Sequence, residues 1–201
     1  MKTVVLDRDG VINKDSDSFI KSPEEWSPIP GSLEAIARLC RADYKIVVAT
    51  NQSGIARGLL DIDTLNRIHN RMLHHIRQKG GEIDAIFFCP HSADFNCECR
   101  KPKPGMFLDL ATRLKINLTG VPAVGDSRRD LECAMAVNAL PVLVRTGKGQ
   151  RTETQIGADG SDPRFAKIPV FDNLSKFTEA LLRGDLDDSI EALSQGAGLT
   201  T

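Results

Sequence analysis

The chain has 201 residues, of which 41% are hydrophobic and 26% are charged, a composition typical of one folded domain. Its 26 basic and 27 acidic residues leave a net charge of -1, which argues against binding to nucleic acid through overall positive charge. No apolar run reaches the roughly 18 residues that a membrane helix needs, and the N-terminus does not resemble a signal peptide. We therefore expect a cytoplasmic monomer with neither nucleic-acid nor membrane partners.

Short apolar strands alternate with amphipathic helices along the chain. The pattern predicts strands at 3–6, 45–50, 83–89, 121–124, 141–144 and 170–171, and helices at 31–42, 61–79, 105–115, 128–137 and from 173. Apolar strands that alternate with helices are typical of a parallel sheet covered on both faces. The sequence thus predicts an α/β fold, a Rossmann-like three-layer parallel sheet, without a separate cap domain.

Two segments near the C-terminus look different. Residues 147–168 are rich in Gly, Thr, Asp and Pro, which predicts a long surface loop. We place the end of the domain at 184 and treat 185–201 as a partly disordered tail, with one short helix around Leu186, Ile190 and Leu193 and disorder beyond about 195.

Polar side chains follow the predicted strands where the strands end. Asp7 and Asp9 follow the first strand, Thr50 and Asn51 end the second, and Asp126 follows the fourth. Ligands of parallel sheets bind at the carboxyl ends of the strands, so we expect these side chains to share one site. Converging carboxylates repel one another unless a cation lies among them, and their oxygens suit Mg²⁺. The set predicts a phosphoryl-transfer site, with Arg100-Lys101 as fixed positive charge.

In their order and spacing, four motifs resemble those of the haloacid dehalogenase superfamily of phosphatases: Asp7-Arg8-Asp9-Gly10-Val11, Thr50-Asn51, Lys101 and Gly125-Asp126-Ser127-Arg128-Arg129-Asp130. The resemblance implies that Asp7 is the nucleophile and Asp9 the general acid and base. It implies that Thr50 and Lys101 hold the phosphoryl oxygens. Asp126 would bind Mg²⁺ with Asp7 and the backbone carbonyl of Asp9, while Asp130 would support the site without binding the metal.

Cys89, His91, Cys97 and Cys99 lie close together in the loop 89–101. Three thiols and an imidazole at this spacing predict a closed, tetrahedral and therefore structural zinc site. Because Arg100 and Lys101 follow the last cysteine directly, zinc would also order the loop that presents these cations. The remaining cysteines, Cys40 and Cys133, are expected to be small buried side chains.

Together, the zinc loop and the run 53–58 resemble one branch of this superfamily, which hydrolyses sugar bisphosphates. The activity that this resemblance implies is hydrolysis of the phosphate at carbon 7 of a heptose 1,7-bisphosphate, a step of lipopolysaccharide precursor synthesis. A histidinol-phosphate phosphatase is the alternative. A 3'-phosphatase of nucleic-acid ends and a catalytically inactive binding module fit less well. By resemblance, the substrate contacts are Asp15, Ser16, Asp17, Ser18, Thr50, Asn51, Gln52, Ser53, Arg100 and Lys101.

The chain also departs from its branch. Ser127 stands where some members have lysine, and Ser18 where some have an aromatic residue. Three histidines of the helix 61–79, His69, His74 and His75, have no partner spacing and are predicted to lie at the surface. Trp26 is predicted to be a packing anchor.

Overall fold

The computed structural model describes residues 2–158 and 163–196. Its six-stranded sheet has the order β3-β2-β1-β4-β5-β6, and every pair of neighbours is parallel. The strands are β1 (Lys2–Leu6), β2 (Tyr44–Asn51), β3 (Ala85–Cys89), β4 (Pro122–Gly125), β5 (Leu140–Val144) and β6 (Val170–Phe171). The order reverses between β1 and β4, and in such sheets this reversal opens a crevice beyond the strand ends.

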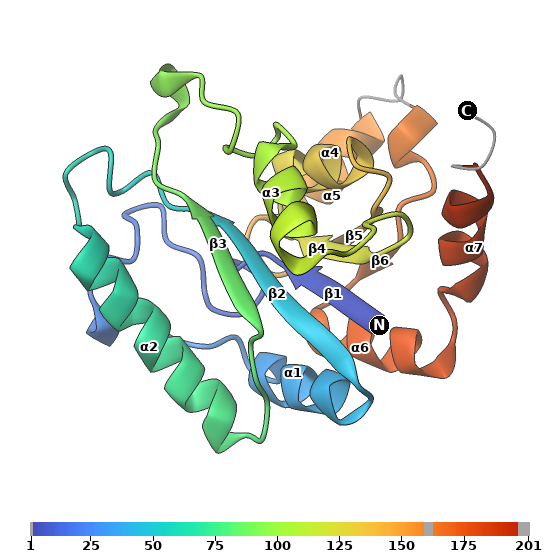
Figure 1. Cartoon of the computed structure of the whole chain (residues 1–201), viewed down its shortest axis with the longest axis horizontal. Helices are drawn as coiled ribbons and strands as arrows, with labels where there is room; N and C mark the ends of the chain where they lie inside the picture. The colour runs from blue at the N-terminus through green and yellow to red at the C-terminus, as the bar shows by residue number, and fades with distance from the viewer. Residues whose placement is uncertain (1, 159–162, 197–201) are drawn as a thin grey trace.

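Helices cover both faces of the sheet (Figure 1). One layer consists of α1 (Ser32–Arg41), α2 (Ile62–Gln78) and α6 (Leu174–Arg183), and the other of α3 (Gly105–Leu114), α4 (Arg128–Met135) and α5 (Gly149–Ala158). A last helix, α7 (Asp187–Gly196), lies near the edge of the sheet. Short 3-10 helices are formed by Pro23–Glu25, Ala93–Phe95 and Pro163–Phe165. The predicted three-layer fold is confirmed.

Alternate residues of each strand supply the two cores. Val4 and Leu6 of β1 face the layer of α1, α2 and α6, whereas Val5 faces α3 and α4. Because successive side chains of a strand point to opposite faces, a strand buried on both sides must be apolar throughout. This explains why the strands were visible in the sequence as continuous apolar runs.

The structure shows how α2 begins and confirms the predicted packing role of Trp26. The side chain of Asp61 caps α2 by accepting a hydrogen bond from the backbone N–H of Thr64 over 2.7 Å. Trp26 is fully buried, and its ring stacks on that of His75 with the centroids 5.5 Å apart. Trp26 therefore anchors the segment that enters α1.

The prediction of a loop over 147–168 is wrong, because this segment contains α5. Its composition gives a weak helix propensity, and tertiary contacts supply the stability instead. The buried Thr152 hydroxyl donates to the Asp126 carbonyl over 2.8 Å. Glu153 accepts two hydrogen bonds from Arg145, over 2.7 and 2.8 Å. The helix therefore packs behind a strand-end aspartate that the sequence had already singled out.

The predicted short helix of the tail is present as α7, and Leu186, Ile190 and Leu193 pack on the main core. The predicted disorder beyond 195 falls mainly on 197–201, which lie outside the described residues. Among the described residues, none of the helices combines the length and the apolar character needed to cross a membrane.

Candidate active site

Three carboxylates meet where the strand order reverses. Asp7 follows β1, Asp126 follows β4, and Asp130 lies in the first turn of α4. All three residues are buried, and one oxygen from each lies within 4.8 Å of the others. The sequence predicted that Asp7 and Asp126 share one site and that Asp130 supports it, and the structure brings all three side chains together.

The close approach of two loops shapes this cluster. Gly10 has φ +82°, and a Cβ atom built on it would lie 2.0 Å from an Asp126 carboxylate oxygen. Any side chain at this position would therefore displace Asp126 as well as strain the backbone. Gly10 of the first motif is thus required because Asp126 of the fourth motif lies directly against it.

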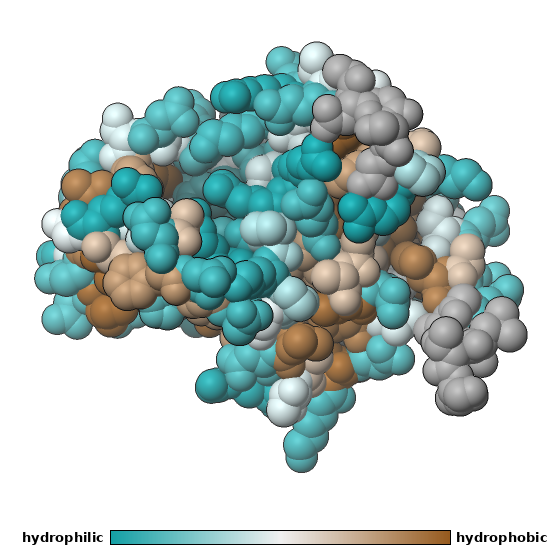
Figure 2. All heavy atoms as spheres, turned by 90° about the horizontal axis from the view of Figure 1, so that it is seen from above, coloured by the Kyte–Doolittle hydropathy of each residue, from teal (hydrophilic) through white to brown (hydrophobic). Residues whose placement is uncertain are grey.

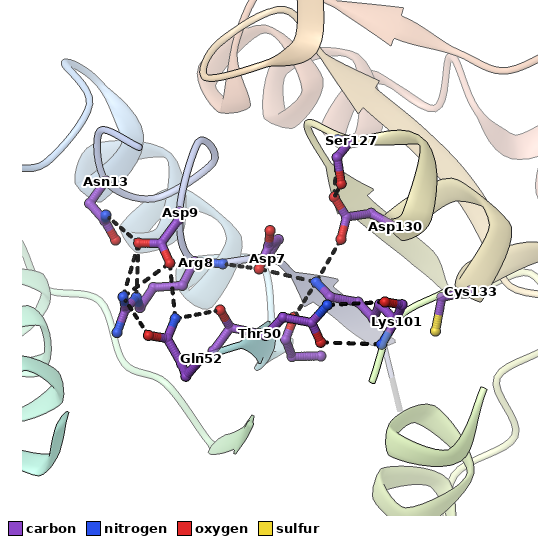
Figure 3. Close-up of polar contacts among 12 residues, drawn as sticks. Asp7, Arg8, Asp9, Asn13, Thr50, Gln52, Lys101, Ser127, Asp130 and Cys133 are labelled. Carbon is purple, nitrogen blue, oxygen red and sulfur yellow. Dashed lines mark hydrogen bonds and ion pairs between the residues drawn. The ribbon is translucent and has the colours of Figure 1, made fainter. Parts of the chain in front are cut away.

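Lys101 brings a cation to the carboxylates (Figure 3). Its ammonium nitrogen lies 3.1 Å from Asp7 Oδ1 and 2.6 Å from Asp130 Oδ1, and it donates to the carbonyl of Ala49 over 2.8 Å. Burial lowers the pKa of this lysine, but the charges of Asp130 and Asp7 outweigh burial and raise it overall. Lys101 is therefore charged and held between two aspartates.

One buried lysine does not balance three carboxylates. Burial, together with the charges of Asp130 and Asp7, raises the pKa of Asp126 to about 8. Burial likewise raises the pKa of Asp7 to about 6, although Lys101 opposes the shift. Uncompensated negative charge and an all-oxygen donor set fit a divalent cation of the Mg²⁺ type. All three carboxylates could offer an oxygen to such a cation. Asp130 is the one that also forms the closer contact with Lys101 and contacts Ser127.

Asp9 turns away from this cluster, toward a group of donors (Figure 3). Its Oδ1 accepts from Arg8 and from the amide of Asn13 over 2.8 Å, and its Oδ2 accepts from Arg8 and from the amide of Gln52 over 2.9 Å. Burial raises the pKa of Asp9, but the Arg8 charge and these hydrogen bonds outweigh burial and hold the pKa below its usual value. The carboxylate side chain is 21% exposed and lines the cavity described below.

The end of β2 connects the remaining polar groups. Gln52 also donates to Thr50 Oγ1 over 3.0 Å, so the hydroxyl hydrogen of Thr50 is left for a ligand. The amide of Asn51 donates to the carbonyl of Lys101 over 3.1 Å and accepts from its backbone N–H over 3.2 Å. Asn51 therefore fixes the backbone of Lys101, which is a positioning role that the sequence did not reveal.

The predicted zinc ligands gather at one point of their loop. Among Cys89, His91, Cys97 and Cys99, the sulfur and Nδ1 atoms that contact one another are 3.2 to 3.6 Å apart. A tetrahedron with Zn–S bonds of about 2.3 Å has edges of roughly 3.8 Å. The four residues therefore fit a closed structural zinc site. Arg100 is tied to the same loop, because its Nη1 donates to the carbonyl of His91 over 3.1 Å.

A cavity of about 240 Å³ lies over the carboxylates. The face seen from above in Figure 2 is mostly hydrophilic, in agreement with a charged ligand. Nearly all residues predicted to contact substrate line the cavity, namely Asp15, Ser16, Asp17, Thr50, Asn51, Gln52, Ser53, Arg100 and Lys101. Ser18 does not line it, because the chain turns after Ser16 and Phe19 occupies the wall instead.

Three further cations line the cavity, Arg57, Arg129 and Lys148, and the sequence had assigned none of them to the site. Lys148 lies 2.9 Å from Asp15 and 3.6 Å from Asp17, so it joins the loop after β5 to the loop after β1. For Arg129, the motif Gly-Asp-Ser-Arg-Arg-Asp offered a signal, since a residue in the first turn of a helix after a strand can face the site.

The prediction that His69 lies at the surface is wrong. Its side chain is buried, and Nε2 lies 3.2 Å from Nη1 of Arg8. A signal was present, because His69 continues the helical spacing of Leu65, Met72 and Ile76, all of which are buried. His74, in contrast, is exposed as predicted.

Two charged residues close to the motifs lie differently with respect to the site. Lys103, which is close in sequence to the motif lysine, turns outward and contacts Glu98 over 2.8 Å. Asp130 forms a capping box with Ser127 at the start of α4 and an ion pair with Lys101. Asp130 therefore supports the site through its neighbours.

Comparison with known proteins places these features in a family. A HAD-hydrolase-like family profile matches residues 98–176. The D-glycero-beta-D-manno-heptose-1,7-bisphosphate 7-phosphatase of Bordetella bronchiseptica is 58% identical over 157 residues, which are 78% of this chain and 88% of that protein. The phosphatase of the same name from Pseudomonas aeruginosa is 48% identical over 180 residues, 90% of this chain and 97% of that protein.

A solved structure agrees with the fold. The crystal structure of D,D-heptose 1,7-bisphosphate phosphatase from B. bronchiseptica, complexed with magnesium and phosphate, superposes with a TM-score of 0.86 at 53% identity. The match covers 91% of this chain and 99% of that one. The chain therefore belongs to the heptose bisphosphate phosphatase family of haloacid dehalogenase-like hydrolases.

Proposed function

We propose that the protein is a Mg²⁺-dependent phosphatase that removes the 7-phosphate of D-glycero-D-manno-heptose 1,7-bisphosphate. The product, heptose 1-phosphate, would serve the synthesis of lipopolysaccharide core precursors. One observation carries the proposal: a chain 58% identical to a phosphatase of this name holds Asp7, Lys101 and Asp126 together at the crevice of the sheet. The comparisons do not favour the alternative, a histidinol-phosphate phosphatase.

The proposed first step forms an aspartyl phosphate. An oxygen of Asp7 attacks phosphorus, and the sugar oxygen leaves with a proton from Asp9. Lys101, 3.1 Å from Asp7, and the hydroxyl of Thr50 are close enough to hold the phosphoryl oxygens during this transfer. Mg²⁺, held by Asp7, Asp126 and the Asp9 carbonyl, would neutralise charge on those oxygens.

In the second step, water attacks the aspartyl phosphate, and Asp9 takes the proton of the water. Inorganic phosphate leaves, so Asp7 returns to its free carboxylate. The hydrogen bonds that lower the pKa of Asp9 suit the role of base, and the proton that Asp9 takes from the water is the one that it gives to the leaving sugar oxygen in the next turnover. Its position at the cavity wall supports contact with a leaving sugar oxygen.

The cavity supports a substrate with more than one phosphate. Besides Lys101, it is lined by Arg57, Arg100, Arg129 and Lys148. Lys148 is already paired with Asp15 and Asp17, so Arg57, Arg100 and Arg129 are the cations that a second phosphate would use. The expectation of a cytoplasmic monomer without nucleic-acid or membrane partners belongs to the same proposal. The expected domain end at 184 does not, because Leu186, Ile190 and Leu193 pack on the main core.

Phosphorus NMR of a reaction with the heptose bisphosphate and Mg²⁺ tests the function directly. The signal of the primary 7-phosphate should disappear while the anomeric signal remains. Loss of the anomeric signal would contradict the proposed regioselectivity. Histidinol phosphate is the matched comparison, and its faster hydrolysis would contradict the proposed substrate.

A further inference from the structure

A buried chain of hydrogen bonds connects α2 to Asp9. Arg8 donates from Nε and Nη2 to both oxygens of Asp9, over 3.0 to 3.1 Å, and from Nη2 to Gln52 Oε1 over 3.1 Å. Its remaining nitrogen, Nη1, lies 3.2 Å from Nε2 of His69. Arg8 is 1% exposed and His69 is 6% exposed. Within the described part of the chain, His69 is the hydrogen-bond partner of Nη1.

The chemistry of the pair fixes the state of the imidazole. A guanidinium has only donors, so Nε2 of His69 must accept, and the ring hydrogen lies on Nδ1. The ring is therefore neutral. Burial, followed by the charge of Arg8, lowers the pKa of His69 to about 3, in agreement with this assignment. Phe88 of β3 packs edge-on against the ring, with the centroids 6.2 Å apart, and helps to fix its orientation.

We propose that His69 is a positioning residue for Asp9 and acts through Arg8. The imidazole of His69 accepts a hydrogen bond from the guanidinium of Arg8, which in turn donates to both carboxylate oxygens of Asp9. His69 lies 61 positions from Arg8 in the sequence and is absent from the cavity lining, so it touches neither substrate nor metal. The inference rests on the proposed function, because Asp9 is the general acid only in that mechanism.

Loss of the acceptor has a definite structural consequence. A buried N–H of Arg8 would lose its partner, and such a donor is costly to leave unsatisfied. The guanidinium would shift to find another acceptor and would carry the Asp9 carboxylate with it. Proton transfer requires hydrogen-bond distance, and a misplacement of about 1 Å can cost about 100-fold in rate. The effect should appear only where the leaving oxygen needs a proton.

Leaving-group dependence separates positioning from general damage. We would measure kcat/KM for the heptose bisphosphate and for 4-nitrophenyl phosphate, whose phenolate leaves without a proton. The variants are His69→Leu, His69→Asn and His69→Gln. Leu lacks the acceptor, Asn is too short to reach Arg8, and Gln places its amide oxygen near the position of Nε2. Exposed His74 on the same helix supplies the control His74→Leu.

We expect His69→Leu and His69→Asn to lower kcat/KM for the sugar ester about 10- to 100-fold. The value for the aryl ester should change less than about threefold, because Asp9 is not needed as an acid there. His69→Gln should restore most of the sugar-ester activity, and His74→Leu should match the wild type. The polar Asn and Gln variants keep the comparison decisive even where His69→Leu does not fold.

Three results would overturn the positioning role. Equal losses of kcat/KM on both esters would indicate that His69 has a structural role alone. Unchanged activity in His69→Asn would indicate that His69 has no role. Increased activity on the sugar ester would mean that Arg8 restrains Asp9. Failure of the wild type to cleave the heptose ester would instead refute the proposed function. In that case, the same variants compared on a primary alkyl phosphate that the wild type does cleave would still decide the role of His69.

Discussion

The ammonium nitrogen of Lys101 lies 3.1 Å from the carboxylate of Asp7, although the two residues come from different structural units. Asp7 directly follows the central strand β1, whereas Lys101 is the last residue of the cysteine and histidine loop 89–101. The loop thus delivers the one cation that touches both Asp7 and Asp130 among the described residues. Disorder of the cysteine and histidine loop should therefore displace Lys101 and lower the reactivity of Asp7.

The first prediction concerns Asp7 itself. Asp7→Asn should lower kcat for the bisphosphate by more than about 10⁴-fold, because a neutral amide does not attack phosphorus. The melting temperature should not fall much, since the substitution removes one of three crowded carboxylates. Steady-state phosphate release and thermal unfolding test the two halves. An Asn variant with near-normal turnover would contradict the covalent mechanism.

Stabilisation by Mg²⁺ should depend on pH. The pKa values of Asp7 and Asp126, about 6 and about 8, exceed those of an unfolded chain, so protonation stabilises the folded protein. That stabilisation is present at low pH and is lost as the pH rises through these values, at about 1.4 kcal/mol per proton and pH unit. Mg²⁺ replaces the protons. It should therefore raise the melting temperature more at pH 8 than at pH 5.5.

The control for this measurement is Asp126→Asn, which removes the group with the higher pKa. In this variant, the Mg²⁺-induced increase in melting temperature should be smaller and should change less with pH. A wild-type increase of equal size at both pH values would contradict the assignment of Asp7 and Asp126 as metal ligands.

Zinc should be a separate, structural metal. Elemental analysis should find about one zinc per chain. Cys97→Ser should lower the melting temperature and raise KM, because Arg100 and Lys101 follow this loop directly. Cys40→Ser is a suitable control, since Cys40 contacts the backbone of Glu82 far from the loop. A zinc-free protein with unchanged stability and activity would contradict the site.

His69 should make the protein sensitive to acid. Its folded pKa of about 3 lies below the 6.5 of an ordinary histidine, so the neutral form stabilises the fold. This contribution is complete above pH 6.5 and is lost as the pH falls toward 3, at about 1.4 kcal/mol per pH unit. In denaturant titrations at pH 7, 5.5 and 4.5, His69→Gln should lose less unfolding free energy than the wild type. Parallel losses in the two proteins would contradict a neutral, buried His69.

The sequence predicted most of the sheet and the carboxylate cluster for one physical reason. Strands buried on both faces are apolar throughout, and a polar residue such as Asp7 marks the point where the apolar strand ends. The zinc ligands were equally readable, because all four lie within one short loop. Local patterns of this kind need no knowledge of distant contacts.

Features that depend on distant contacts were missed. The helix α5 is stabilised by Thr152 on the carbonyl of Asp126 and by an ion pair with Arg145, neither of which is visible in its composition. The environment of His69 depends on a residue 61 positions away. The cations of the cavity come from separate loops and from the start of α4, and their convergence follows from the order of the strands.

The second phosphate of the substrate should be recognised by Arg100 and Arg129. Both line the cavity, and burial followed by the charge of Arg129 lowers the pKa of Arg100, so the two cations lie close enough to repel each other. A phosphate bound beside them would relieve this repulsion. Ser127, in place of the lysine of some relatives, leaves Arg129 as the cation that the start of α4 presents to the cavity.

Arg100→Ala and Arg129→Ala should therefore each raise KM for the bisphosphate about 10- to 100-fold, as expected for a lost charged hydrogen bond of about 1.5 to 3 kcal/mol. For heptose 7-phosphate, which lacks the second phosphate, KM should rise much less, because its single phosphate is held by Lys101 and Thr50. Arg128→Ala is the matched control. Its guanidinium lies 5.0 Å from the Phe165 ring centroid and contacts Glu132 over 2.8 Å, away from the cavity lining. If both substrates lose affinity equally in the Arg129 variant, this residue acts on the transferring phosphoryl group instead, and the second-phosphate site must lie elsewhere in the cavity.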